Sequence, residues 1–121
     1  MESEVVSGVR SLDWFRKMSL IRNFEKEIYV LNKARLVCGT AHLYIGMEAI
    51  AAGVGQAMRA DDYTFATYRG HAHTLARGVP LGPVLAEFLG RSNGLLAGTG
   101  GSMHLTLFQR GLVGSFSIIG V

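Results

Sequence analysis

The segment TFATYRGHAH, residues 64–73, gathers side chains that could bind an anion or move a proton. Tyr68 and Arg69 follow a short β-favouring run, so a phenol and a guanidinium are expected at the carboxyl edge of a sheet, where α/β folds bind ligands. Gly70 permits a tight turn, and a helix starting after it would aim backbone N–H groups at the same place. The pattern favours a phosphate site. The structural alternative is an ion pair between Arg69 and one of two nearby aspartates, Asp61 and Asp62.

Histidine is the other source of chemistry in this chain. All four histidines lie in loop-like, glycine-bearing segments: His42, His71, His73 and His104. Because imidazole titrates near neutrality, these positions suit proton transfer or phosphate binding, and capping of turns is the open structural alternative. A metal site is not favoured, since no carboxylate or cysteine stands near His71 and His73 to complete a tetrahedral set.

The segment GTGGSMH, residues 98–104, could cradle a phosphate with its backbone. It lacks the lysine of a P-loop and a preceding strand. Ser102, which stands near His104, has neither an elbow motif nor an orienting acid of the kind that activates a nucleophilic serine. This segment alone therefore predicts no nucleotide site and no serine nucleophile.

A long helix is the first element that must position these groups. Residues 11–37 are predicted to form it, with Ser11 as its cap and Gly39 ending the helical run. Its apolar residues recur at three- and four-residue spacing, as in an amphipathic helix packed on a core: Trp14, Met18, Ile21, Phe24, Ile28 and Leu31.

Shorter elements follow. The Ala-rich run IGMEAIAAGVGQAMRA, residues 45–60, predicts a second helix buried on most sides, residues 63–67 predict a strand, and residues 83–89 predict a helix with Gly90 just past its end. Glycine-rich loop follows, and the final LVGSFSIIGV is interpreted as a strand or loop entering a core. Because one strand cannot form a sheet, the sequence predicts the N-terminal part of an α/β fold, mostly helical and lacking most of the parallel sheet.

Composition excludes several functional classes. The chain has 121 residues, 49% of them hydrophobic, which is enough for one domain. The net charge is +3 and the sequence has no run of Lys and Arg, which argues against nucleic-acid binding. The longest apolar stretch is interrupted by Glu48, which argues against a membrane span. The first ten residues resemble neither a signal nor a transit peptide. The single cysteine, Cys38, fits a protein of a reducing compartment, and its side chain is expected to be buried. A cytoplasmic location is expected.

Four motifs together resemble a known family. HLYIGMEAIAAG, DDYTFATYRGHAHTLARG, LAEFLGR and GTGGSMH, in this order and nearly evenly spaced, resemble the α subunit of thiamine diphosphate-dependent E1 components of 2-oxo acid dehydrogenase complexes. The resemblance covers residues 12–121 and is nearest to the pyruvate and acetoin dehydrogenase branches. It implies a thiamine-diphosphate-binding α/β fold and oxidative decarboxylation of a 2-oxo acid, with acyl transfer to lipoamide. The implied partners are the E1 β subunit and the E2 lipoyl acyltransferase.

The resemblance also implies roles for particular residues. Tyr68 and Arg69 match the pair that holds the cofactor diphosphate in this family. His42 matches a histidine beside the thiazolium ring, where it would assist by hydrogen bonding or proton transfer. Ser117 and Ile119 lie in a segment whose backbone is expected to touch the aminopyrimidine. Mg²⁺ is expected to bridge the diphosphate, with its protein ligands, a Gly-Asp-Gly sequence and a later Asn, outside this chain.

The implied domain is a partial E1 α subunit over residues 1–121, with three cofactor-side loops: 40–47, 67–73 and 98–104. Met47 stands where many relatives have Gln, and Ser117 where Gly is usual. The alternative function is a non-catalytic truncated remnant or a subunit-docking module that uses its helices as the binding surface.

Overall fold

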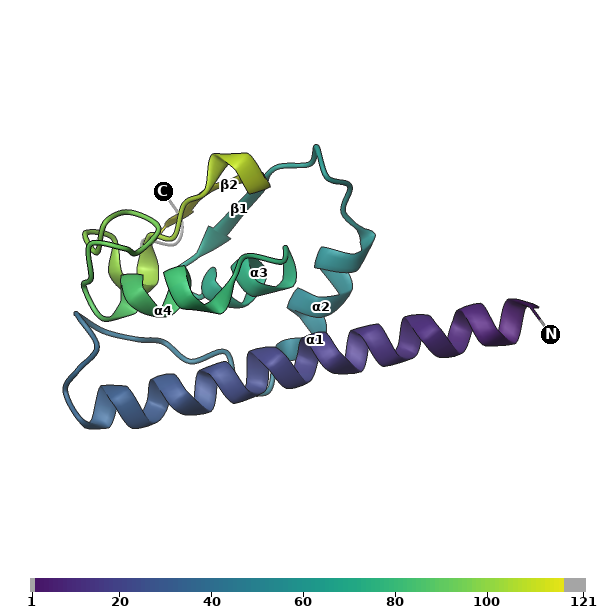
Figure 1. The fold of residues 1–121 in the computed structure, drawn as a ribbon, viewed down its shortest axis with the longest axis horizontal. Helices are drawn as coiled ribbons and strands as arrows, with labels where there is room; N and C mark the ends of the chain where they lie inside the picture. The colour runs from purple at the N-terminus through teal and green to yellow at the C-terminus, as the bar shows by residue number, and fades with distance from the viewer. Residues whose placement is uncertain (1, 117–121) are drawn as a thin grey trace.

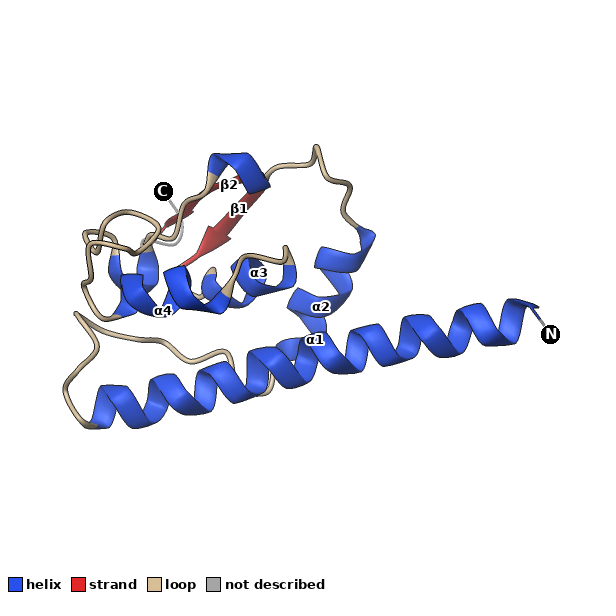
Figure 2. Cartoon of the chain, viewed as in Figure 1, coloured by secondary structure: helices blue, strands red, loops and turns tan. Residues whose placement is uncertain are grey.

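A computed structural model describes residues 2–116, with the side chains of residues 11–116. The elements in order are α1 (Glu2–Lys33), α2 (Glu48–Ala57), β1 (Thr64–Thr67), α3 (His71–Ala76), α4 (Leu81–Phe88), the 3₁₀ turns η1 (Gly101–Met103) and η2 (Phe108–Arg110), and β2 (Leu112–Phe116). In Figure 1, α1 runs along one side of the molecule, and its N-terminal half extends past the other elements. Helices far outweigh strands (Figure 2), which confirms the predicted, mostly helical α/β segment.

Helix α1 begins earlier than predicted. It starts at Glu2 rather than at Ser11, because the first ten residues contain no proline and place Glu2 and Glu4 at the positive end of the helix dipole. The apolar stripe packs as expected along the middle of the helix, where Ile21 and Ile28 are fully buried. Trp14 is 45% exposed, so the stripe reaches further than the core that covers it.

The end of α1 is also different from the prediction. The helix stops at Lys33, several residues before Gly39. Arg35 takes a left-handed conformation with φ of 59°, and two backbone hydrogen bonds of 3.0 Å close the end: Leu36 N–H to Leu31 O and Arg35 N–H to Asn32 O. This is the Schellman pattern, with arginine at the position that glycine usually occupies. The usual glycine signal was therefore missing from the sequence.

Two burial expectations are wrong. Helix α2 is not buried on most sides, because Ile50 and Val54 are exposed while Ala51 and Ala52 face the interior. Cys38 is exposed rather than buried, in the connection between α1 and α2. In both places local composition indicated an apolar environment, but only one face of each segment meets the rest of the chain.

The two strands form a parallel pair. Thr64 of β1 is opposite Leu112 and Thr67 is opposite Phe116, with an irregularity after Thr64. β1 is thus one residue shorter than predicted, and the strand-or-loop reading of LVGSF resolves into strand β2. Parallel strands need a long crossover connection, which α3, α4 and the glycine-rich loop supply here. The carboxyl ends of both strands therefore lie at the same edge of the sheet.

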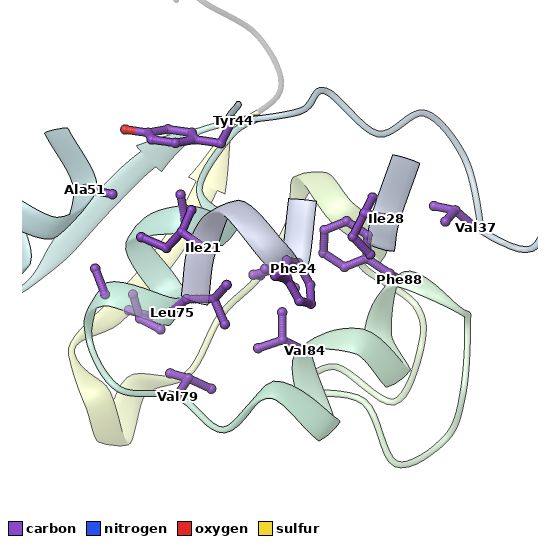
Figure 3. Packing of buried hydrophobic residues seen from close by; sticks show 14 residues of the cluster. Ile21, Phe24, Ile28, Val37, Tyr44, Ala51, Leu75, Val79, Val84 and Phe88 are labelled. Carbon is purple, nitrogen blue, oxygen red and sulfur yellow. The ribbon is translucent and has the colours of Figure 1, made fainter. Parts of the chain in front are cut away.

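The core lies between α1 and the shorter helices. Figure 3 shows Phe24 and Ile28 of α1 beside Phe88 of α4, and Ile21 of α1 next to Leu75 of α3. The rings of Phe24 and Phe88 meet edge to face, with centroids 5.5 Å apart. Within residues 2–116, no helix has the length and apolar character that crossing a membrane requires.

A buried glutamate organises the glycine-rich loop. The Glu87 side chain on α4 is fully buried and accepts four backbone N–H groups: Leu96 at 2.8 Å, Gly98 at 2.9 Å, Gly100 at 2.7 Å and Gly101 at 3.1 Å. Burial alone would raise the pKa of Glu87, but the four donors outweigh it and lower the pKa below its ordinary value. The loop thus wraps around a carboxylate.

A second glutamate joins α1 to α2. Glu48, at the first position of α2, forms a two-pronged ion pair with Arg22, with N–O distances of 2.5 and 2.8 Å, and both carboxylate oxygens also lie 3.1 Å from the Gly46 N–H. The Arg22 hydrogen bonds are the main reason that the pKa of Glu48 falls to about 2, and the Gly46 N–H adds to the effect. Glu48 is therefore ionised over nearly the whole accessible pH range.

Replacing Glu87 tests the loop anchor. Glu87→Gln should lower the free energy of unfolding by roughly 2–3 kcal/mol, because an amide cannot accept four N–H groups with the strength of a carboxylate. Urea denaturation of the chain followed by circular dichroism measures the change. Glu27→Gln, at an exposed site on α1, is the control. Equal stability of the two variants would contradict the anchoring role.

The Glu48 pair predicts acid sensitivity. Because its pKa is about 2 in the folded chain and 4.5 ordinarily, its stabilisation is complete above about pH 5 and is lost as the pH falls toward 2. Glu48→Gln should therefore lower the free energy of unfolding by about 1–3 kcal/mol at neutral pH, reduced by solvent screening at Arg22, and by much less near pH 2. Urea titrations between pH 2 and 7 measure the difference in the free energy of unfolding between wild type and variant. A difference that does not change with pH would contradict a stabilising role of the ionised Glu48 carboxylate.

Candidate functional site

The site expected from the sequence lies where β1 ends. After Thr67 the chain passes through Tyr68, Arg69 and Gly70 into α3. Gly70 is required there, because a Cβ atom would collide with the Ser115 side chain of β2. The close approach of β2 brings the carboxyl edge of the sheet directly beside Tyr68 and Arg69, as the strand-end argument predicted.

Three loops that are distant in the sequence meet at this edge. The Ser102 hydroxyl donates to Thr40 O at 2.7 Å, which joins residues 98–104 to residues 40–47. His71 Nε2 lies 3.0 Å from His42 O, which joins residues 40–47 to the 67–73 segment. A small groove of about 260 Å³ separates residues 38–40 from residues 98–103. The three segments expected on the cofactor side are thus neighbours.

His42, Tyr68 and Arg69 form one group. The rings of His42 and Tyr68 pack edge to face, with centroids 4.6 Å apart. The Arg69 guanidinium carbon lies 4.9 Å from the centre of the Tyr68 ring, a cation–π geometry. His42 is exposed, whereas Tyr68 and Arg69 are half-buried. The structure therefore brings together three of the five site residues that the sequence predicts. The other two, Ser117 and Ile119, lie outside the described residues.

Arg69 is held in place by neutral acceptors. Its Nε donates to Leu43 O at 3.0 Å, and its Nη1 donates to the Tyr68 hydroxyl oxygen at 3.1 Å. Within the described residues it forms no ion pair with Asp61 or Asp62, so the structural alternative for Arg69 is wrong. Its positive charge is thus oriented but not neutralised by a carboxylate.

The remaining donors suit a phosphate. Nη2 of Arg69 makes no hydrogen bond within residues 11–116, and the Tyr68 hydroxyl, which accepts from Arg69, keeps its own proton for donation. A guanidinium edge beside a phenol hydroxyl matches the oxygens of a phosphate or diphosphate group. The geometry therefore supports the anion-binding interpretation of these two residues.

A buried ion pair that sequence reasoning missed lies behind this group. Glu25 of α1 and His71 of α3 are both completely buried, with Oε1 and Nδ1 only 2.6 Å apart. The other carboxylate oxygen of Glu25 accepts the Tyr44 N–H at 2.9 Å. A signal was present in the sequence, because Glu25 falls on the buried face between Phe24 and Ile28, where a carboxylate needs a partner.

Tyr44 and His73 complete the inner side of the group. Their polar atoms, the Tyr44 hydroxyl and His73 Nε2, are 3.4 Å apart. Burial, followed by electrostatic repulsion from the neighbouring His71, lowers the pKa of His73, and burial raises the pKa of the Tyr44 hydroxyl. Near neutral pH the tyrosine therefore keeps its proton and His73 is uncharged, so neither adds charge to the site.

The glycine-rich segment does not offer its backbone to a ligand in the way that GTGGSMH suggested. The N–H groups of Gly98, Gly100 and Gly101 already point to the Glu87 carboxylate. This segment is shaped around an internal anion, and its contact with Thr40 places it beside the 40–47 loop. Among residues 11–116, no three His, Cys, Asp or Glu side chains gather as a metal-binding set.

Comparison with known proteins identifies the family of this chain. The family model of the dehydrogenase E1 component matches residues 16–121. The chain is 38% identical over 111 residues to the α subunit of acetoin:2,6-dichlorophenolindophenol oxidoreductase of Bacillus subtilis, covering 92% of this chain and 33% of that protein. It is 40% identical over 106 residues to the pyruvate dehydrogenase E1 α subunit of Rhizobium meliloti, covering 88% of this chain and 30% of that protein.

A plant relative shows the same pattern. The mitochondrial pyruvate dehydrogenase E1 subunit α-1 of Arabidopsis thaliana is 40% identical over 114 residues, which cover 94% of this chain and 29% of that protein. The chain thus spans about a third of the length of these relatives. The family that the four motifs predicted is confirmed, and this chain belongs to the dehydrogenase E1 component family.

Proposed function

We propose that this chain contributes the diphosphate-binding residues and one active-site histidine to a thiamine diphosphate-dependent E1 component. The observation that carries the proposal is the Tyr68–Arg69 pair at the carboxyl edge of the sheet, with donors that pair with none of residues 11–116 and with His42 packed on Tyr68. The names of the relatives, pyruvate dehydrogenase and acetoin oxidoreductase, support pyruvate or acetoin as the substrate class. A cytoplasmic location stays a prediction from the sequence.

The donor set fits the proposed cofactor. Arg69 Nη2 and the Tyr68 hydroxyl would hold oxygens of the diphosphate, while the contacts to Leu43 O and the Tyr68 ring keep the guanidinium in place. Bound thiamine diphosphate would supply the carbanion chemistry that decarboxylates a 2-oxo acid. Mg²⁺ would share the diphosphate charge through ligands other than the described residues, since none of these form a metal-binding set.

His42 has a different proposed role. Its exposed ring stands at the edge of the group, packed on Tyr68 and free to hydrogen-bond a substrate. An imidazole in contact with a substrate can serve as a hydrogen-bonding or proton-transfer group. The proposed partners are an E1 β subunit, which the relatives' names as α subunits imply, and an E2 lipoyl acyltransferase that receives the acyl group.

The alternative, a non-catalytic docking module, has its own supporting observation. Helix α1 exposes large apolar side chains along its first half, including Leu12, Trp14 and Phe15 at 55%, 45% and 63%. Exposed apolar residues on one helix suit a protein–protein contact. A subunit contact is compatible with catalysis, so cofactor binding is the property that separates the two functions.

Arg69 gives the direct test of the proposed function. Arg69→Ala in the complete protein should weaken thiamine diphosphate binding by about 1.5–3 kcal/mol, or roughly 10- to 150-fold, because it removes a charged hydrogen-bond donor. Calorimetric titration with Mg²⁺ present measures the affinity. Arg16→Ala, an exposed arginine paired only with Asp13 on α1, is the matched control. Unchanged affinity after the Arg69 substitution would reduce Arg69 to a structural role.

His42 gives an independent test. His42→Ala should leave the affinity for thiamine diphosphate within about twofold and lower kcat by about 100-fold or more, the usual contribution of a proton-transfer group. Steady-state assays with the assembled complex, at saturating cofactor, measure kcat. If the substitution abolished cofactor binding yet left turnover normal at saturation, the proposed role of His42 would be wrong.

A further inference from the structure

Side chains from other parts of the chain hold the backbone of His42 and of the two residues that follow it. His42 O lies 3.0 Å from His71 Nε2, Leu43 O accepts from Arg69 Nε at 3.0 Å, and the Tyr44 N–H donates to Glu25 Oε2 at 2.9 Å. This segment belongs to no helix or strand, so side chains supply the partners that a regular element would provide. The three side chains come from α1, from α3 and from the turn between β1 and α3.

The Glu25–His71 pair controls two of these three contacts. His71 presents Nδ1 to the Glu25 carboxylate, 2.6 Å from Oε1, and Nε2 to the His42 carbonyl, and among the described residues Nδ1 and Oε1 contact no other polar partner. A carbonyl oxygen can only accept, so Nε2 must carry a proton. The carboxylate thus faces one side of the imidazole while the other side holds the residue with the proposed catalytic ring.

Packing alone does not account for an ion pair at this place. Both side chains are completely buried, and burying polar or charged groups is costly unless hydrogen bonds satisfy them. Apolar residues of similar volume would fill the space between α1 and α3 without that cost. What apolar residues would not provide is an acceptor for the Tyr44 N–H and a donor for the His42 carbonyl.

We propose that Glu25 and His71 are a positioning pair that fixes the place of the His42 ring by holding the backbone on both sides of Leu43. The proposal rests on the proposed function of His42 and adds residues to it that touch neither cofactor nor substrate. The pair sets the direction from which the imidazole of His42 approaches Tyr68, whose ring centre lies 4.6 Å away. Loss of the pair frees this segment without emptying the core.

A double variant separates positioning from packing. Glu25→Leu with His71→Phe removes the polar groups without leaving a cavity, and the phenyl ring can keep the edge-to-face contact that His71 makes with Phe88, centroids 5.4 Å apart. Replacement of a buried ion pair by apolar residues is often neutral or stabilising, so the variant is expected to fold. Hydrogen–deuterium exchange of the peptide spanning residues 41–47 should become at least tenfold faster, with peptides of α1 unchanged.

Controls make each outcome decisive. Glu27→Gln, on the exposed side of α1, should leave exchange in residues 41–47 unchanged. Glu25→Gln keeps an acceptor for the Tyr44 N–H and should keep part of the protection. If the double variant exchanges faster throughout α1 as well, Glu25→Gln becomes the deciding variant. The proposal is overturned if residues 41–47 exchange as slowly as in the wild type in the deciding variant, which is the double variant or, if that exchanges faster throughout α1, Glu25→Gln.

Turnover supplies the second readout. In the assembled complex, the double variant should lower kcat at least tenfold while the affinity for thiamine diphosphate, which Tyr68 and Arg69 hold, stays within threefold. A loss of cofactor affinity with unchanged kcat would overturn the positioning role. Failure of the wild-type complex to bind thiamine diphosphate would instead refute the proposed function, and the exchange experiment would still decide whether the pair holds residues 42–44.

Discussion

The irregular segments of this chain contain backbone N–H and carbonyl groups that no helix or strand pairs, and charged side chains on the helices are their partners. Glu87 accepts four N–H groups of the glycine-rich loop. Arg77, at the end of α3, donates to four carbonyls, those of Arg59, Ala60, Asp62 and Arg110. These side chains supply hydrogen-bond partners that regular secondary structure does not provide, and they thereby fix where the loops lie.

Charged side chains that pair with loop backbone also position the candidate site. Arg69 donates to the Leu43 carbonyl through Nε, while its Nη2 pairs with none of the described residues, so one guanidinium fixes the loop and would bind the proposed diphosphate. Glu48 extends the pattern to the start of α2 through the Gly46 N–H. The loops near the strand ends are therefore anchored by side-chain contacts, although they have no regular hydrogen-bonded structure. Preorganisation of this kind is what a cofactor diphosphate and a nearby imidazole require.

The sequence predicted correctly the elements that depend on residues close together in the chain. The apolar period of α1, the strand before Tyr68 and the helix after Gly70 all depend on neighbouring residues, and the structure has each of them. The ion pair of Glu25 with His71 and the four-fold contact of Glu87 were missed, because both join segments far apart in the sequence. The end of α1 was misplaced for a different reason, since arginine is a rare residue for a left-handed helix end.

The parallel pairing of β1 with β2 has a consequence for folding. The strands are adjacent in space, but α3, α4 and the glycine-rich loop lie between them in the chain. Closing so long a connection loses chain entropy before any strand hydrogen bond forms, whereas the helices need only local contacts. We therefore expect the helices to form first and the strand pair late. The sheet edge beside Tyr68 and Arg69 then takes shape only near the end of folding, so a chain whose helices are already formed can still lack the edge on which the candidate site is built.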